Sequence, residues 1–176
     1  NERGDISNHI AQDAEKYWAI RRESFNLLRT KIKGRQTAPF VDDIIVPPEC
    51  LPQFLPELNA LFTPYKADMT YTIAGHAGDG NFHIIPLMDL SSARTRQIIP
   101  VLIDAVYSLV MRYKGSITAE HNDGIIRTPY LEQMYGAEIC ALFAKTKHIF
   151  DPKNIFNPNK KVGGTKEYAM SHIRTE

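Results

Sequence analysis

The stretch that decides the fold is residues 71–87, which read YTIAGHAGDGNFHIIPL. Its two ends, Tyr71–Gly75 and Ile84–Leu87, are rich in β-forming residues and predict two antiparallel strands. Between them, Asp79 and Gly80 are typical of a tight reversal, because glycine tolerates positive φ and aspartate bonds to nearby backbone. The sequence therefore predicts a β-hairpin with a glycine-rich turn.

Two histidines, His76 and His83, flank this turn. In a hairpin they face each other across the two strands, close enough for one metal ion to bind both. A pair of histidines is a weak motif without further ligands, so a hairpin with two solvated histidines is the alternative.

A further ligand follows about forty residues later, where residues 116–124 read SITAEHNDG. This segment predicts a short strand that runs into a turn and carries Glu120 beside His121. Neighbours in a regular strand point to opposite faces, so the two can share a site only where the strand ends or bulges. The Asn122-Asp123-Gly124 sequence favours such an end.

Two histidines and one carboxylate, with coordination positions left open, are typical of a catalytic zinc or iron(II) site. His121 would then be free to act as a general base beside the metal. An edge-strand pair of Glu120 and His121 in solvent is the alternative, and the residues alone leave it open.

The composition is that of an ordinary globular chain, with 176 residues, 43% hydrophobic and 23% charged. A net charge of +1 gives no argument for nucleic acid or an anionic membrane surface. Cys50 and Cys140 form no metal-type spacing and suit a reducing compartment. No apolar run approaches the roughly 20 residues of a membrane span. We expect a cytoplasmic protein without a transmembrane segment, with peripheral attachment to a membrane left open.

The order of the predicted elements is strand–helix–strand–strand–helix–strand, which is typical of a ferredoxin-like α+β fold: an antiparallel sheet with helices on one face. Helices are expected to flank it at both ends. The predicted helices are 5–31, 51–65, 92–114, 129–135 and 137–149, and the predicted strands outside the hairpin are 41–47 and 116–120. The expected parts are an N-terminal helical segment (1–34), the ferredoxin-like domain (35–162) and a polar tail without a packing face (163–176).

Three motifs carry a family resemblance: residues 76–83, residues 119–121, and residues 150–160, which read FDPKNIFNPNK. In this order and spacing they resemble the carboxy-terminal domain of the FAD-linked oxidases, within the vanillyl-alcohol oxidase superfamily. The branch is that of D-lactate dehydrogenases, glycolate oxidases and D-2-hydroxyglutarate dehydrogenases. The resemblance runs from about Tyr17 to Val162, and it is to one part of such an enzyme.

The resemblance implies a flavin-dependent dehydrogenase of 2-hydroxy acids. His76, His83 and Glu120 would hold a divalent metal, which this ligand set leaves open as zinc, iron(II) or manganese. The metal would polarise the substrate, His121 would remove the hydroxyl proton as general base, and FAD would take the hydride.

Further residues gain a role from the resemblance alone. Arg21, in a Trp-x-x-Arg element, would grip the substrate carboxylate, although it also reads as a surface residue in a charge run. Asn81 is instead singled out by its place inside the predicted turn, where it would contact the substrate, orient the site or cap the hairpin. Asn157 and Lys160, in an Asn-Pro-x-Lys element, would lie near the flavin, and chain punctuation after a helix is the alternative.

The sequence departs from the family pattern at two places. Asn122 occupies the first glycine position of the Gly-x-Gly that usually follows Glu-His, and asparagine tolerates the left-handed geometry of such a turn. Val41 stands where dehydrogenases of D-2-hydroxyglutarate carry a lysine for the second carboxylate. A monocarboxylate such as D-lactate or glycolate is therefore the expected substrate.

The chain holds no glycine-rich FAD-binding half, so we expect FAD to come from a domain or subunit outside it, as in a fragment or a split gene product. The expected partners are that domain and a small 2-hydroxy acid, without nucleic acid; a homo-oligomer is left open. Two rival functions remain. One is a self-contained metal-dependent hydrolase or lyase, and the other is a non-catalytic binding or assembly domain.

Overall fold

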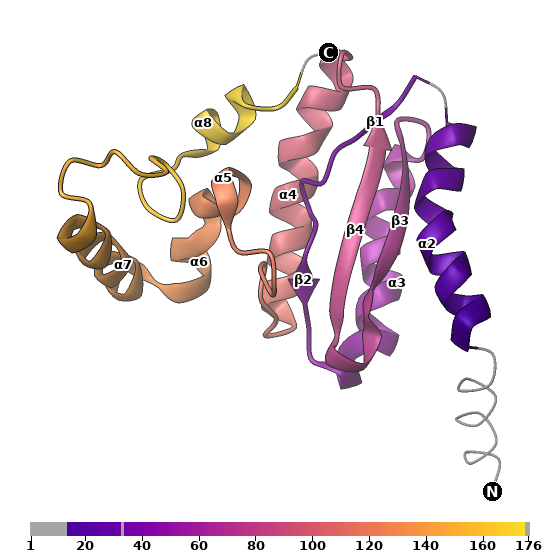
Figure 1. Cartoon of the computed structure of the whole chain (residues 1–176), viewed down its shortest axis with the longest axis horizontal. Helices are drawn as coiled ribbons and strands as arrows, with labels where there is room; N and C mark the ends of the chain where they lie inside the picture. The colour runs from indigo at the N-terminus through magenta and orange to yellow at the C-terminus, as the bar shows by residue number, and fades with distance from the viewer. Residues whose placement is uncertain (1–13, 33, 175–176) are drawn as a thin grey trace, which may run out of the picture. The chain divides into compact units, whose positions relative to one another are not determined.

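A computed structural model describes residues 14–32 and 34–174, and it divides into two compact units, Asn1–Arg35 and Gln36–Glu176. In the first unit, helix α2 spans Ala14–Lys31 (Figure 1). The part of the predicted helix before residue 14 lies outside the described residues. The side chain of Arg21 does too.

The predicted hairpin is the centre of the sheet. Strand β3 (Met69–His76) pairs antiparallel along its whole length with β4 (Asn81–Met88), from Met69 opposite Met88 to His76 opposite Asn81. The turn between them is one short 3-10 helix, Ala77–Asp79, followed by Gly80 at φ 72°. The Asp-Gly reversal predicted from the sequence is thus confirmed.

The other edge of β4 pairs with two short strands at its opposite ends. β1 (Gln36–Thr37) lies beside the end of β4, and β2 (Ile44–Ile45) lies beside its start. Beyond β2, within the described residues, the sheet continues as one bridge between Ile45 and Ser116. The order bridge–β2–β4–β3 is that of a ferredoxin-like sheet whose last strand is reduced to a single pair.

Two strand predictions were too long. The predicted strand 41–47 is regular only at Ile44–Ile45, and the predicted strand 116–120 is not a strand. For the segment 116–120 the reason is a tertiary contact: the N–H groups of residues 119–121 donate to the carboxylate of Asp43 instead of a neighbouring strand. The prediction of an antiparallel sheet with helices, in the α+β class, is confirmed.

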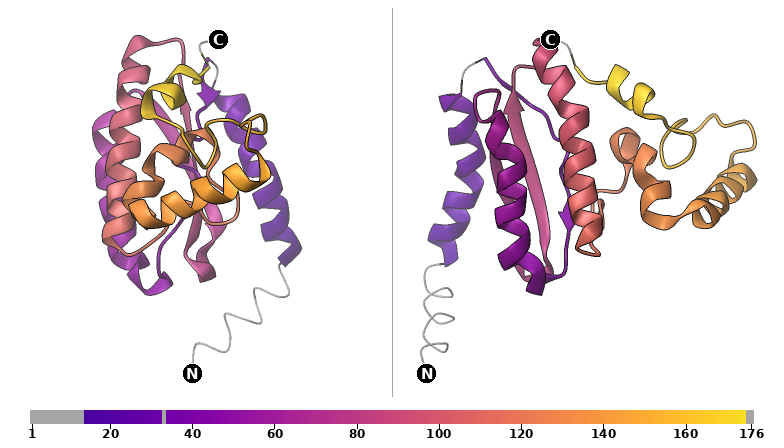
Figure 2. Two further views of the ribbon diagram at one scale, coloured as in Figure 1. Left: turned by 90° about the vertical axis from the view of Figure 1, so that its left-hand side faces the viewer. Right: turned by 180° about the vertical axis from the view of Figure 1, so that it is seen from behind.

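Helices α3 (Leu51–Phe62) and α4 (Ala93–Arg112) lie side by side on one face of the sheet (Figure 2, right). Short 3-10 helices, Pro48–Cys50 and Thr63–Tyr65, flank α3. The main core lies between these helices and the sheet. Its fully buried side chains include Ile44, Phe54, Leu58, Phe62, Ile84, Met88, Ile99, Leu102, Ile103, Val106 and Tyr107.

After the sheet the chain forms a run of further helices, most of them short. They are α5 (Gly124–Arg127), a 3-10 turn (Thr128–Tyr130), α6 (Leu131–Tyr135), α7 (Ala137–Phe150) and α8 (Lys166–Ser171). The helical pieces predicted at 129–135 and 137–149 match this part closely.

The expectation of a polar tail without a packing face was wrong for α8. The hydroxyl oxygen of Thr165 caps this helix by accepting from the N–H of Tyr168 at 3.1 Å. Ala169 is buried, and Met170 and Ile173 pack against the core. Three apolar residues among polar ones are enough to hold a six-residue helix, and they are too few to give a sequence pattern.

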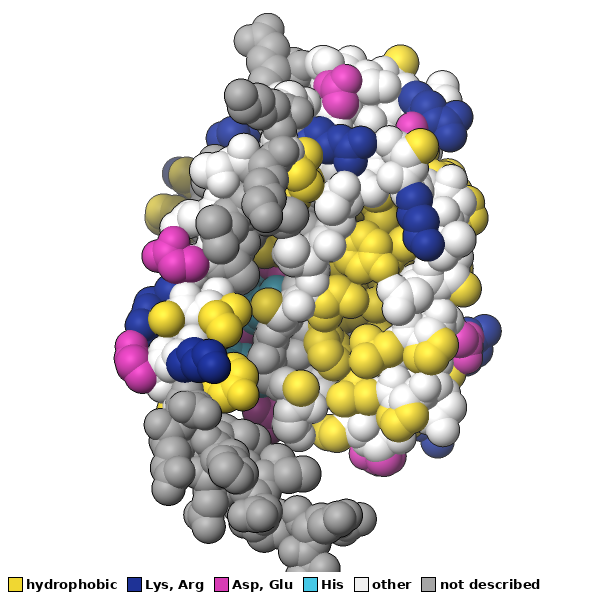
Figure 3. Space-filling view, turned by 90° about the vertical axis from the view of Figure 1, so that its right-hand side faces the viewer, with side chains coloured by type: hydrophobic (Ala, Val, Ile, Leu, Met, Phe, Trp, Pro, Cys, Tyr) yellow, Lys and Arg dark blue, Asp and Glu magenta, His cyan; other side chains and the backbone are white. Residues whose placement is uncertain are grey.

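Hydrophobic side chains gather on the face that carries β3 and α3 (Figure 3). These two elements contribute the partly buried Leu55, Leu61 and Tyr71 and the more exposed Ile73.

Within residues 14–32 and 34–174, none of the helices combines the length and the apolar character that crossing a bilayer requires.

Candidate metal and substrate site

The hairpin places its two histidines on one face of the sheet. His76, on β3, is paired with Asn81 on β4, and paired residues project to the same face of a sheet. Asn81 and His83 are two residues apart on β4 and also share a face, so the imidazoles of His76 and His83 project to the same side. Their ring centroids are 6.5 Å apart. The alternate residues Phe82 and Ile84 belong to the core under α3 and α4, so His83 faces away from these helices.

The position of Glu120 and His121 is set by one buried carboxylate. Asp43 is fully buried and accepts N–H bonds from Ala119 at 2.9 Å, Glu120 at 3.2 Å and His121 at 2.9 Å. The side-chain amide of Asn81 adds a fourth donor at 3.1 Å. Burial alone would raise the pKa of Asp43, but these four donors outweigh it and hold the pKa below its usual value.

The backbone of residues 119–121, which turns around Asp43, brings Glu120 and His121 to the histidines of the hairpin. Oε1 of Glu120 lies 2.7 Å from Nε2 of His83, 3.9 Å from Nε2 of His76 and 3.8 Å from Nε2 of His121. The ring of His121 stacks on that of His83, with centroids 4.7 Å apart and planes 18° apart. All four residues predicted for the site therefore meet at one carboxylate oxygen.

The donor set fits a divalent metal ion. One ligand atom each from His76, His83 and Glu120 lies within 4.8 Å of the others. Ligand atoms on a tetrahedral zinc are about 3.3 Å apart, so small side-chain adjustments would close the set around one ion. Two imidazoles and one carboxylate leave a coordination position for water or substrate.

The site is closed on one side and open on the other. The side chain of His83 is 14% exposed, whereas those of His76, Glu120 and His121 are 46% to 56% exposed. His83 is thus the least exposed of the four, at the base of the cluster, and the other three side chains border its open side.

Asp42 is a site residue that the sequence analysis missed. Its Oδ1 lies 3.1 Å from Nδ1 of His83, and its Oδ2 lies 3.3 Å from Nδ1 of His121. The buried guanidinium of Arg127 donates to the backbone carbonyls of Asp42 and Asn122, which holds the two segments together. Neither residue belongs to a motif, and only the fold brings them to the histidines.

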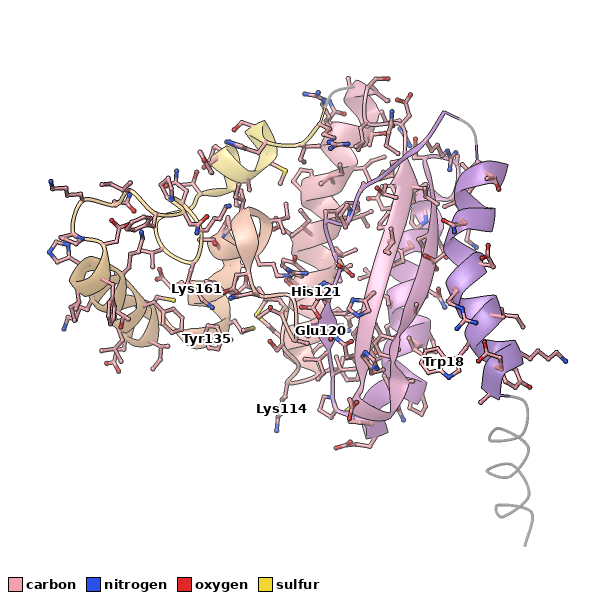
Figure 4. All side chains as sticks on the ribbon, viewed as in Figure 1. Trp18, Lys114, Glu120, His121, Tyr135 and Lys161 are labelled. Carbon is pink, nitrogen blue, oxygen red and sulfur yellow. The ribbon has the colours of Figure 1, made fainter. Side chains whose placement is uncertain are left out.

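The turn after His121 has the left-handed geometry expected from its sequence, with φ of 64° at Asn122 and 58° at Gly124. Lys161, which the sequence analysis also missed, ties the carboxy-terminal loop to this turn. Its Nζ donates to Oδ1 of Asn122 at 3.1 Å and pairs with the buried carboxylate of Asp123. In Figure 4, Glu120 and His121 lie at the sheet edge, and Lys161 lies toward α5 and α6.

The predicted flavin-side residues, Asn157 and Lys160, line one pocket of about 310 Å³ together with Phe150 and Phe156. Nζ of Lys160 lies 3.2 Å from Oδ1 of Asn157. A larger apolar pocket of about 580 Å³ lies between α4, α5, the segment 37–40 and the segment after α8. Lys160 lines this pocket too, whereas His76, His83, Glu120 and His121 do not. The structure therefore groups Asn157 with Lys160, at a place separate from the histidines.

Of the two predicted substrate contacts, Arg21 and Asn81, the structure describes the side chain of Asn81 only. The side chain of Arg21 lies outside the described residues, so its role stays a prediction. Asn81 is 4% exposed, and its amide donates to Asp43 and to the backbone carbonyl of Ile44. Its Oδ1 has no hydrogen-bond partner among the described residues. These contacts describe a residue that joins the hairpin to Asp43, and direct contact with substrate stays a prediction.

Comparison with protein families agrees with the motifs and the fold. Residues 2–161 match the family of FAD linked oxidases, C-terminal domain. The chain therefore belongs to this family.

Curated relatives include enzymes with three different names. The chain is 31% identical to a D-2-hydroxyglutarate dehydrogenase of Escherichia coli K12 over 83% of this chain and 14% of that protein. It is 32% identical to a D-lactate dehydrogenase of Anaerostipes hadrus over 67% of this chain and 25% of that protein. It is 28% identical to glycolate oxidase subunit GlcD of Bacillus subtilis over 90% of this chain and 33% of that protein. The chain thus spans a third or less of the length of these relatives.

Proposed function

We propose that this chain is the substrate- and metal-binding domain of a flavin-dependent 2-hydroxy-acid dehydrogenase. The observation that carries the proposal is the meeting of His76, His83, Glu120 and His121 around one carboxylate oxygen. A site of this make-up in a chain of the FAD-linked oxidase family favours oxidation of a hydroxy acid over the other chemistries that such ligands serve.

In this proposal His76, His83 and Glu120 hold a divalent metal. The ion would act as a Lewis acid toward the hydroxyl and carboxylate oxygens of the substrate. His121 stands beside the ligands with an exposed ring, and its Nε2 accepts the hydroxyl proton as the bond to C2 changes from C–O to C=O. Flavin, when bound, supplies the acceptor for the hydride from C2.

The partner in this proposal is the flavin-binding domain, which meets the chain at α7 and the loop after it. Four side chains there are unusually exposed for hydrophobic residues: Ile149 at 73%, Phe150 at 81%, Ile155 at 65% and Phe156 at 68%. The pocket lined by Asn157 and Lys160 lies among them. An apolar surface of this kind marks an interface, and the relatives contain a long region beyond the matched part to cover it.

Two substrate classes remain within the proposal. Val41 is fully buried and offers no cation for a second carboxylate, which favours a monocarboxylate such as D-lactate or glycolate. The names of several relatives favour D-2-hydroxyglutarate as the second candidate. Arg21 has the same predicted role for both classes, which is to bind the carboxylate next to the hydroxyl carbon. A guanidinium suits this role, because it binds a carboxylate with two parallel hydrogen bonds.

The test is anaerobic flavin reduction by the flavoprotein that joins this chain to its flavin-binding domain. We expect D-lactate, glycolate or D-2-hydroxyglutarate to reduce the flavin. His121→Asn should slow the step by roughly 100-fold or more, because it removes the base. The matched control is His172→Asn, at an exposed position just after α8 and away from the proposed interface.

Equal rates for the parent and His121→Asn would contradict the role of His121. Metal-dependent turnover of a hydrolysable substrate by this chain alone, without flavin, would favour the hydrolase instead.

A further inference from the structure

Asp42 lies between β1 and β2, and its side chain is 17% exposed at the base of the histidine cluster. Its two carboxylate oxygens go to two different imidazoles: Oδ1 to Nδ1 of His83 at 3.1 Å and Oδ2 to Nδ1 of His121 at 3.3 Å. Its backbone carbonyl accepts a hydrogen bond from the buried Arg127, which fixes the backbone that carries the carboxylate. One carboxylate thus spans both rings.

The chemistry of these contacts determines the tautomer of each ring. An ionised carboxylate only accepts hydrogen bonds, so both Nδ1 atoms carry a proton when they contact Asp42. In a neutral imidazole the proton is then absent from Nε2, which keeps its lone pair. The two nearly parallel rings therefore present two Nε2 lone pairs on the same side.

Those Nε2 atoms are the ones that face the site. Nε2 of His83 lies 2.7 Å from Oε1 of Glu120, and Nε2 of His121 lies 3.8 Å from the same oxygen. A lone pair on nitrogen and a carboxylate oxygen repel each other at such a distance. A cation between them removes the repulsion, and without a cation the half-exposed side chain of Glu120 can turn away from His83. Asp42 thus prepares His83 to bind a cation together with Glu120, and prepares His121 to receive a proton.

We propose that Asp42 is a positioning residue that holds His83 and His121 in the same Nδ1–H tautomer, with both Nε2 atoms directed at the site. The inference deepens the proposed function and rests on it for the roles of the two histidines. Asp42 itself touches neither metal nor substrate in this arrangement. A carboxylate behind a metal-binding histidine typically raises metal affinity, and one that also orients the base links the two roles.

A competing arrangement uses the same atoms differently. Asp42 and the Nδ1 atoms of His83 and His121 also lie close enough to hold an ion themselves. In that case metal would bind to Nδ1, and Nε2 would carry the proton. The nitrogen that carries the proton in the metal-free chain, and the nitrogen that binds added metal, therefore decide between the two.

The experiment is long-range 1H–15N NMR of the histidine rings in the metal-free chain at about pH 8.5, above the ordinary imidazole pKa of about 6.5. We expect the parent to show His83 and His121 as the Nδ1–H tautomer. Asp42→Ala should shift both toward the Nε2–H form that free histidine prefers. Asp79→Ala, in the exposed turn of the hairpin, is the matched control and should change neither ring.

The second readout is zinc affinity measured by competition with a chelator. Asp42→Ala should bind zinc roughly 10- to 100-fold more weakly than the parent, whereas Asp79→Ala should bind as the parent does. Circular dichroism shows whether each variant is folded. If Asp42→Ala does not fold, Asp42→Asn, which keeps the size of the side chain, takes its place.

Unchanged tautomers in both Asp42 variants, or zinc bound through Nδ1, would overturn the inference. Because the tautomers are read without metal, the outcome is separable from the proposed function. If the parent binds no metal but its tautomers depend on Asp42, the positioning role stands and the metal-dependent mechanism fails.

Discussion

Asp43 carries its charge in the interior of the protein, where an unpaired carboxylate would be very costly. It is stabilised there by three consecutive backbone N–H groups and the amide of Asn81. The residue also has a φ of 59°, which aspartate tolerates better than most residues. A structural carboxylate therefore determines where Glu120 and His121, the proposed metal ligand and base, lie.

Asp43→Asn should destabilise the chain by about 3 kcal/mol, because the new NH₂ group would face N–H donors and leave buried groups unpaired. Urea unfolding measures this change in the free energy of unfolding. Asp79→Asn, at an exposed turn position, should leave the stability within about 0.5 kcal/mol of the parent. If Asp43→Asn lost no more than about 0.5 kcal/mol of unfolding free energy, the three N–H groups would have to find other acceptors.

At the residue scale, the sequence identified the side chains that form motifs. His76, His83, Glu120 and His121 could be found because their types and spacing follow a known pattern. Asp42 and Asp43 could not, since two acidic residues before a short strand look like an ordinary solvated pair. Their partners are about 40 to 80 residues away in the chain, and only the folded sheet brings them together.

The hairpin depends on a close approach at Gly80, which adopts a φ of 72°. A Cβ at this position would lie 1.9 Å from the backbone oxygen of Val46, which leaves no room for any side chain. The neighbouring Gly78 is different, because a Cβ there would meet nothing within 4 Å. The two glycines of one turn therefore make a matched pair.

Gly80→Ala should destabilise the chain by about 2 kcal/mol or more, since it combines a clash with a strained φ. It should also weaken zinc binding, because it shifts the strand that carries His83. Gly78→Ala should change neither quantity appreciably. Thermal unfolding and chelator competition measure the two effects, and equal behaviour of the two variants would contradict this account of the turn.

The end of α7 is held by Asp151. Its carboxylate pairs with Lys147 and accepts N–H bonds from Ile155 at 2.9 Å and Phe156 at 2.8 Å. The ion pair with Lys147 and these two N–H donors outweigh burial and lower the pKa of Asp151. A folded-state pKa below the unfolded value means that the stabilisation is complete above about pH 4 and is lost as the pH falls through the folded-state pKa.

We therefore expect the amide protons of Ile155 and Phe156 to lose protection from hydrogen exchange as the pH falls below about 4, after correction for the intrinsic rate. Asp151→Asn should show weak protection of both amides already at neutral pH and little further pH dependence. Strong protection of both amides at low pH in the parent would contradict the role of Asp151.

At the scale of elements, the hairpin and the longer helices were predictable, whereas the short strands and the short helices α5 and α8 were not. The hairpin and α3 and α4 have clear apolar patterns over eight or more residues. The segment 116–120 has a strand-like pattern too, but Asp43 accepts the N–H groups that a strand would offer to a neighbour. A competing side-chain acceptor is a tertiary effect, and local sequence does not report it.

At the scale of the whole molecule, the chain is one part of a larger assembly in the account given above. The exposed Ile149, Phe150, Ile155 and Phe156 are where we place the flavin-binding domain. Hydrogen exchange of the isolated chain and of the complete flavoprotein should show added protection at residues 149–156 in the latter. The exposed part of α4 around Val101 serves as the internal reference and should not change. Added protection at α4 alone would place the interface elsewhere.

In the proposed function the hairpin and the segment 119–121 form one metal site, and the metal content of the chain reports whether they do. Elemental analysis of the purified chain, never exposed to chelator, should find about one equivalent of a transition metal such as zinc, iron or manganese. His83→Ala should retain little, and His148→Ala should retain as much as the parent. Equal metal content in the parent and His83→Ala, or none in the parent after zinc is added, would contradict the claim.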